Sequence, residues 1–205
     1  MTHEEIKIKF RNAFTTYIHR RGSEQLLNFL EVNGFFEAPA SMKHHGSFPG
    51  GLAAHSVNVF ERLAWIAANE TRTQSEALDF NIEPLAVVSL LHDICKMDAY
   101  KLTDKWEKDE NGKPQQVQRY TYTNNFPVGH GEKSVILIMR FMELTEEEML
   151  AIRWHMGPYD FYAKGGGYDL DNAFKQCKLA VMLHLADMMA THFDEREEAG
   201  KWQNG

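Results

Sequence analysis

Apolar side chains recur at helical spacing over most of the chain. Ile6, Phe10 and Phe14 stand four positions apart, and a second apolar segment follows them, which predicts N-terminal helices within residues 4–33. Residues 52–69 repeat the pattern, and residues three and four apart share one face of a helix. The spacing therefore predicts amphipathic helices that bury one side in a common core.

The run at residues 85–96, LAVVSLLHDICK, is apolar on nearly every side and predicts a helix buried deep in the core. It contains the adjacent pair His92 and Asp93. Burying an imidazole beside a carboxylate costs free energy unless a partner offsets the lost hydration, and a divalent cation accepts both groups as ligands. The alternative is a hydrogen-bonded His92 and an Asp93 that caps the next turn, and the dipeptide alone leaves both interpretations open.

Residues 98–125 differ from the helical segments on either side. YKLTDKW and VQRYTYT are rich in β-branched and aromatic residues, and Asn111 and Gly112 between them are a turn signal. They predict a small β-hairpin around residues 99–124, inserted between helices, and leave open whether it is a lid over a site or decoration. The expected fold class is an all-α helical bundle with a small inserted β-hairpin.

Length and composition indicate one globular domain over residues 1–205, with N-terminal helices at 4–33, a core at 40–192 and a short acidic tail at 193–205. The chain is 43% hydrophobic and 25% charged, and no apolar run reaches membrane-spanning length. Two cysteines exclude a disulfide framework and the N-terminus lacks a secretory signal, so we expect a cytoplasmic protein with no membrane partner. A net charge of −7 argues against an extended nucleic-acid surface and favours a small phosphorylated partner such as a nucleotide.

Four further polar residues lie in or beside apolar helical patterns, namely His55, His130, His155 and Asp187. Taken alone, each is better explained by a buried hydrogen bond than by a metal ion. Together with His92 and Asp93 they form a set of four histidines and two aspartates. Their nitrogen and oxygen atoms suit divalent Fe, Mn, Co, Zn, Ni or Mg better than an ion that prefers thiolates.

The order H, HD, H, H and D, carried by GGLAAHS, LHDICK, PVGHGEKS, WHMG and the late Asp187, resembles the HD-domain metal-dependent phosphohydrolase superfamily over roughly residues 40–192. The two extra histidines are typical of the branch that holds two divalent metal ions. The resemblance implies an HD-domain bundle whose first ion is bound by four side chains: His55, His92, Asp93 and Asp187. Asp93 would bridge to a second ion, which His130 and His155 complete.

One position departs from the family pattern. Where the family often has Ile-Gly-Lys after the pair, this chain has Ile94, Cys95 and Lys96. By the resemblance, Lys96 contacts a phosphate group as a point charge, with an exposed lysine at a helix end as the alternative. Cys95 is expected to be a small buried residue and not a ligand.

The resemblance implies a phosphohydrolase or phosphodiesterase in which Asp93 and Lys96 are catalytic. A hydroxide that bridges the metals would attack the phosphate ester of a nucleotide or of a nucleic-acid end. Lys133 and Arg153 would balance charge on the substrate, with surface positions as their alternative, and Tyr122 of the hairpin is a further candidate for substrate binding.

Two other function classes stay open. One is a di-iron oxygenase of the HD-like type, which oxygen uptake with ferrous iron would distinguish. The other is a non-catalytic, metal-stabilised nucleotide-binding module, which a turnover screen would distinguish.

Overall fold

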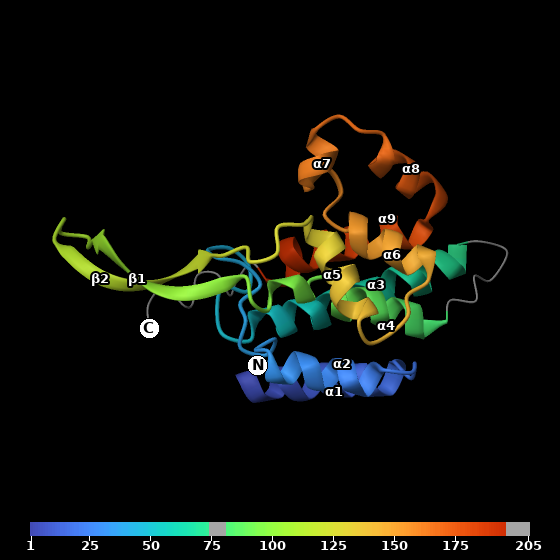
Figure 1. The fold of residues 1–205 in the computed structure, drawn as a ribbon, viewed down its shortest axis with the longest axis horizontal. Coiled ribbons are helices and arrows are strands. Elements are labelled where there is room, and N and C mark those ends of the chain that lie inside the picture. Colours follow the sequence, from blue (N-terminus) through green and yellow to red (C-terminus); the bar gives the residue numbers. More distant parts are fainter. Residues whose placement is uncertain (74–80, 196–205) are drawn as a thin grey trace.

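Helices make up most of the computed structural model, which describes residues 1–73 and 81–195 (Figure 1). The α-helices are α1 (His3–Tyr17), α2 (Ser23–Val32), α3 (Gly51–Thr73), α4 (Ile82–Leu91), α5 (His130–Met139), α6 (Glu146–Trp154), α7 (Phe161–Lys164), α8 (Asp169–Gln176) and α9 (Lys178–Met189). Short 3-10 turns at Ile94–Lys96 and Gly157–Tyr159 and a π-helical turn at Ala190–Asp194 complete the helical segments. The strands β1 (Tyr100–Lys108) and β2 (Pro114–Tyr122) form an antiparallel pair. The predicted helical bundle with an inserted β-hairpin is thus confirmed.

The buried helix predicted from the run at 85–96 is α4 with the 3-10 turn that follows it. Every residue from 85 to 91 is buried, and α4 contacts α1, α3, α6 and α9. A helix with neighbours on all sides needs apolar residues on every face, which explains why this run is not amphipathic. Asn81 caps the start of α4 by accepting a hydrogen bond from the backbone N–H of Glu83. The other end carries His92 and Asp93 into the middle of the bundle.

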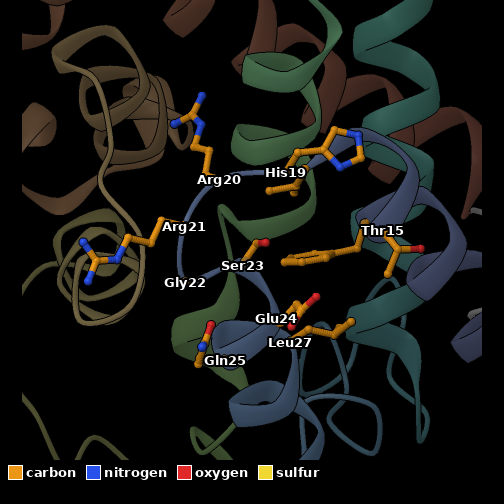
Figure 2. A pocket seen from close by; sticks show the side chains of 11 residues that line it. Thr15, His19, Arg20, Arg21, Gly22, Ser23, Glu24, Gln25 and Leu27 are labelled. Atoms are coloured by element: carbon orange, nitrogen blue, oxygen red, sulfur yellow. The ribbon is translucent and has the colours of Figure 1, made fainter.

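The N-terminal helices α1 and α2 lie side by side along one edge of the bundle (Figure 1), and α1 packs on α3 and α4. The loop between α1 and α2 borders a pocket of about 390 Å³, which Figure 2 shows from close by. None of the six predicted metal ligands lines this pocket. From the same loop, Arg20 forms an ion pair with Glu148 of α6 and so ties the N-terminal helices to the bundle.

The hairpin extends outward from the helices, at the left of Figure 1. Its register pairs Tyr100 with Tyr122 and Lys108 with Pro114, and Gly112 in the turn has a φ of +77° that favours glycine. Because side chains alternate along a strand, the aromatic residues gather on one face and most of the charged residues on the other. Most of the hairpin side chains are exposed, including Trp106.

The C-terminal part departs from the sequence-based expectation. The apolar pattern predicts one last long helix that starts near Asp171, whereas extended backbone at Cys177 separates α8 from α9. The predicted acidic tail at 193–205 lies mostly outside the described residues, but its residue Glu195 is buried against the bundle. Within residues 1–73 and 81–195, none of the helices combines the length and the apolar character that a membrane crossing requires.

Candidate metal centre

The carboxylate of Asp93 is the hub of a buried polar cluster. It directly follows α4 and His92, and it is surrounded by one ammonium and four imidazole groups. Its nearest contacts are His130 Nε2 at 2.5 Å and Lys96 Nζ at 2.6 Å. The Nε2 atoms of the remaining histidines follow at 3.4 Å for His155, 3.5 Å for His92 and 3.9 Å for His55. Asp93 thus lies at the centre of the potential ligand atoms.

Backbone carbonyl groups set the orientation of two of these rings. The Nδ1 atom of His92 donates to the carbonyl oxygen of Ser89 at 2.8 Å, and that of His155 donates to the carbonyl oxygen of Ile152 at 2.7 Å. Because a carbonyl oxygen only accepts, the proton sits on Nδ1 and the Nε2 lone pair faces the cluster. The buried Nε2 of His155 has no hydrogen-bond partner in the described part of the chain. An unpartnered buried nitrogen of this kind fits a metal ligand.

The side of the cluster away from His130 is formed by α3, α4 and α9. His55 Nε2, from α3, lies 3.2 Å from Asp187 Oδ1 of α9 and 3.3 Å from His92 Nε2. Donor atoms of these three side chains all lie within 4.8 Å of one another, which is close enough to share an ion. The same holds for His92, Asp93 and His155. The described structure therefore brings the six predicted ligands to one place.

Close packing of α5 on α6 brings His130 to the site. Gly131 lies so near the end of α6 that a Cβ atom there would sit 2.5 Å from the carbonyl oxygen of Arg153. Only glycine permits this approach, which leaves the rings of His130 and His155 with centroids 5.4 Å apart. Cys95, expected to be no more than a buried filler, lies with its Sγ 3.5 Å from His130 Nδ1. Donor atoms of Asp93, Cys95 and His130 also lie within 4.8 Å of one another, so the thiol belongs to the potential ligand set.

Burial and neighbouring charges shift the pKa values of three histidines in the cluster. Burial lowers the pKa of His55, but Glu195 and Asp187 outweigh it and raise that pKa to about 10. Burial likewise lowers the pKa of His130, but Cys95 and Asp93 raise it to about 10. The pKa of His92 falls to about 3, mainly because of burial. A cation would take the place of the protons that His55 and His130 hold, so metal binding should release protons.

Lys96 lies beside the cluster, with its Nζ 2.6 Å from the carboxylate of Asp93. Burial alone would lower the pKa of its ammonium group, but the Asp93 carboxylate outweighs burial and raises it above its ordinary value. In turn, Lys96 and the neighbouring histidines hold the pKa of Asp93 well below its ordinary range despite burial, which has the opposite effect. Lys96 is therefore charged and is placed next to any ion that Asp93 holds.

Unlike Lys96, the other three candidates for substrate binding form no hydrogen bond or ion pair with Asp93 within the described residues. Lys133 is buried and donates to Asp98 at 2.8 Å, so the alternative of a surface charge is wrong for it. The guanidinium of Arg153 is largely buried over the ring of Trp154 and pairs with two carboxylates, those of Glu132 and Asp160. Tyr122 is exposed, at the base of the hairpin, where its ring contacts that of Tyr100.

Two residues outside the six predicted ligands also lie at the site. His45, in the loop before α3, where the sequence leaves open a substrate contact or a plain loop position, has its ring centroid 5.1 Å from that of His55. Glu195 lies 3.0 Å from His55 Nδ1, although it belongs to an acidic run that is typical of a solvated tail. No spacing or apolar pattern marks either residue, so their role depends on the chain path alone.

Comparisons of the chain with protein-family models, with curated proteins and with solved structures find no match. The assignment therefore depends on the geometry of the site. Within the described residues, that geometry is a buried cluster of His and Asp side chains that is able to bind metal.

Proposed function

We propose that this protein is a metal-dependent phosphohydrolase or phosphodiesterase of the HD-domain type, acting on the phosphate ester of a nucleotide or of a nucleic-acid end. The observation that carries the proposal is the convergence of the donor atoms on Asp93, together with the unpartnered Nε2 of His155. Nitrogen and oxygen donors in this number suit a pair of divalent ions.

The residues divide into two groups around Asp93. The first ion would be held by His55, His92, Asp93 and Asp187. The second would be held by Asp93 with His130 and His155, and the thiol of Cys95 lies close enough to join them. Divalent ions at such a site supply Lewis-acid catalysis and lower the pKa of a water molecule that attacks phosphorus.

The protein side chains contribute orientation and charge. The carbonyl groups that accept from His92 and His155 keep the Nε2 lone pairs of both rings directed inward, toward the position of an ion. Lys96 would stabilise the negative oxygens of the phosphate as a point charge beside Asp93. Lys133 and Arg153 rank after Lys96 as phosphate contacts, because neighbouring carboxylates already neutralise them.

Metal analysis of matched variants tests the proposal. We expect Asp93→Ala to lose bound metal and all turnover while the helical circular dichroism signal survives. Asp104→Ala is the control, because it removes an exposed carboxylate from β1 of the hairpin. Both variants and the wild type are measured by elemental mass spectrometry and against a panel of phosphomonoesters, phosphodiesters, nucleotides and short oligonucleotides.

Several results would overturn the proposal. Equal metal content in the wild type and in Asp93→Ala would show that the cluster is not the metal site. Oxygen consumption with ferrous iron, in the absence of phosphoester turnover, would assign the site to oxygenase chemistry. Tight nucleotide binding without turnover under any metal would assign a binding module.

A further inference from the structure

The two ring nitrogens of His55 face carboxylates from the same stretch of chain. On one side, Nε2 lies 3.2 Å from Asp187 Oδ1. On the other, Nδ1 lies 3.0 Å from Glu195 Oε1 and 3.3 Å from Oε2. We infer that Glu195 is a positioning residue of the metal centre, which keeps a proton on Nδ1 of His55 and leaves Nε2 to bind the ion. The inference rests on the metal site of the proposed function.

His55 differs in this respect from the other inward-facing histidines. His92 and His155 donate from Nδ1 to neutral backbone carbonyl groups, whereas His55 donates to a carboxylate. Hydrogen bonds to an ionised acceptor are about twice as strong as neutral ones. A carboxylate behind a histidine also makes the opposite nitrogen a more basic ligand. Glu195 should therefore strengthen His55 as a ligand beyond what its backbone-oriented neighbours achieve.

Asp187 is positioned to favour the opposite tautomer of His55, with the proton on Nε2, if Glu195 is removed. Asp187 Oδ1 lies within hydrogen-bond distance of His55 Nε2, so a neutral ring could place its single proton on Nε2 and donate to Asp187. That tautomer would occupy the lone pair that the ion needs. Glu195 favours the other tautomer, because its carboxylate accepts only from Nδ1. The carboxylate thus decides which nitrogen of His55 is available.

Contacts from the π-helical turn and from α3 position the Glu195 carboxylate. The π-helical turn Ala190–Asp194 ends with the N–H of Glu195 donating to the carbonyl of Ala190 at 3.2 Å. From α3, Asn58 Nδ2 donates to Glu195 Oε1 at 3.0 Å. Arg62 Nε, by contrast, donates at 2.8 Å to Oδ2 of the neighbouring Asp194 and not to the Glu195 carboxylate, so Asp194 serves as a matched control position. Asn58 and Arg62 lie three and seven positions after His55, on the same face of α3.

The burial of Glu195 supports the same conclusion. Its side chain is 3% exposed, and a carboxylate removed from water needs partners that compensate its charge. Its described hydrogen-bond partners are His55 and Asn58, and a ring nitrogen of His45 lies within 4.8 Å of its carboxylate. π-Helical turns are rare and frequently occur at functional sites, which is consistent with a turn kept to deliver this carboxylate.

Metal affinity tests the inference. The dissociation constants for Mn²⁺ and Zn²⁺ are measured by competition with a chelator for the wild type, Glu195→Ala, Glu195→Gln and Asp194→Ala. We expect Glu195→Ala to weaken binding of the more tightly bound ion by about 10 to 100-fold, the range found for residues that hydrogen-bond to metal ligands. Glu195→Gln keeps an oxygen acceptor without the charge, so it should recover part of the loss. Asp194→Ala, which breaks only the contact with Arg62, should stay within about twofold of the wild type.

Two readouts separate positioning from a structural role. The absorption spectrum of the Co²⁺-loaded protein reports the ligand geometry, and we expect it to change in Glu195→Ala but not in Asp194→Ala. Unfolding of the chelator-treated proteins reports stability without metal. Unchanged affinity in both Glu195 variants, or equal losses in Asp194→Ala, would refute the inference.

The experiments distinguish a failure of the inference about Glu195 from a failure of the proposed function. A wild type that binds metal tightly but hydrolyses no phosphoester leaves the role of Glu195 intact and refutes the phosphohydrolase. A wild type that binds no divalent metal refutes both. If Glu195→Ala fails to fold, Glu195→Gln provides the test. This neutral side chain has the same shape, and the inference requires that it still weakens metal binding relative to the wild type.

Discussion

The ion pair between Arg20 and Glu148 offers a sharp test of how the N-terminal helices are joined to the bundle. The guanidinium donates from Nη1 to Glu148 Oε2 at 2.7 Å and from Nη2 to Oε1 at 2.5 Å. The Glu148 side chain is 1% exposed and that of Arg20 is 21% exposed. Glu148 also accepts from the N–H of Thr145, which completes the capping box at the start of α6. Arg20→Ala would therefore leave a buried carboxylate with one neutral donor.

The expected loss follows from that geometry. Removing one partner of a buried ion pair costs about 3 to 5 kcal/mol, because the remaining charge is left without compensation. Arg20 is partly exposed, so water can reach the carboxylate once the guanidinium is gone, and we expect about 2 to 4 kcal/mol of unfolding free energy to be lost. The pair Arg11–Glu31, which joins α1 to α2, is the control, because Arg11 is 48% exposed. Arg11→Ala should cost less than about 1 kcal/mol.

Urea unfolding of the chelator-treated proteins, followed by circular dichroism, measures both losses. The consequence should reach the metal centre, because α6 begins at the capping box and ends one residue before His155. We therefore expect Arg20→Ala to lower metal affinity as well, while Arg11→Ala leaves it unchanged. If Arg20→Ala costs no more than Arg11→Ala, then the burial and two-point geometry of this pair do not stabilise the fold as argued.

Three further predictions concern the site itself. Gly131→Ala should destabilise the protein by about 1 to 3 kcal/mol and reduce metal content, because its Cβ would collide with the backbone of Arg153; thermal unfolding and elemental analysis measure both effects. Lys96→Ala should lower kcat/KM for phosphoesters by about 10 to 100-fold, which corresponds to the loss of one hydrogen bond to a charged group. Steady-state kinetics at saturating metal measure this effect, and an unchanged kcat/KM would contradict the prediction. Adding metal at 100 times its dissociation constant should raise the free energy of unfolding of the chelator-treated wild type by about 2.7 kcal/mol, as measured by urea unfolding. The same increase in Asp93→Ala would show that the ion binds elsewhere.

The helices and the hairpin could be predicted because their signals are local. The apolar run before His92 requires burial on every side, and Asn111 and Gly112 between two β-rich segments favour a tight turn. The capping box of Thr145 and Glu148 likewise lies within four consecutive residues. The break between α8 and α9 was missed, because nothing in the local pattern around Cys177 opposes a continuous helix.

The site could be predicted only in part. The ligands at His55, His92 and Asp93 stand inside apolar helical patterns, where a polar residue is conspicuous. Glu195 carries no such signal, since an acidic residue among acidic neighbours is usual on a solvated segment. The partner of Lys133 was also hidden, because Asp98 lies 35 positions away along the chain and reaches Lys133 only where the 3-10 turn after α4 packs on α5.

By itself, the sequence determined where helices form, where the hairpin turns and which histidines and aspartates lie on buried faces, because these depend on spacing along the chain. Only the tertiary structure decided that Nε2 of His55 faces the cluster and that Glu195 lies behind this ring. The contact between His55 and Glu195 joins residues 140 positions apart, and its geometry depends on how α3, α9 and the π-helical turn pack together.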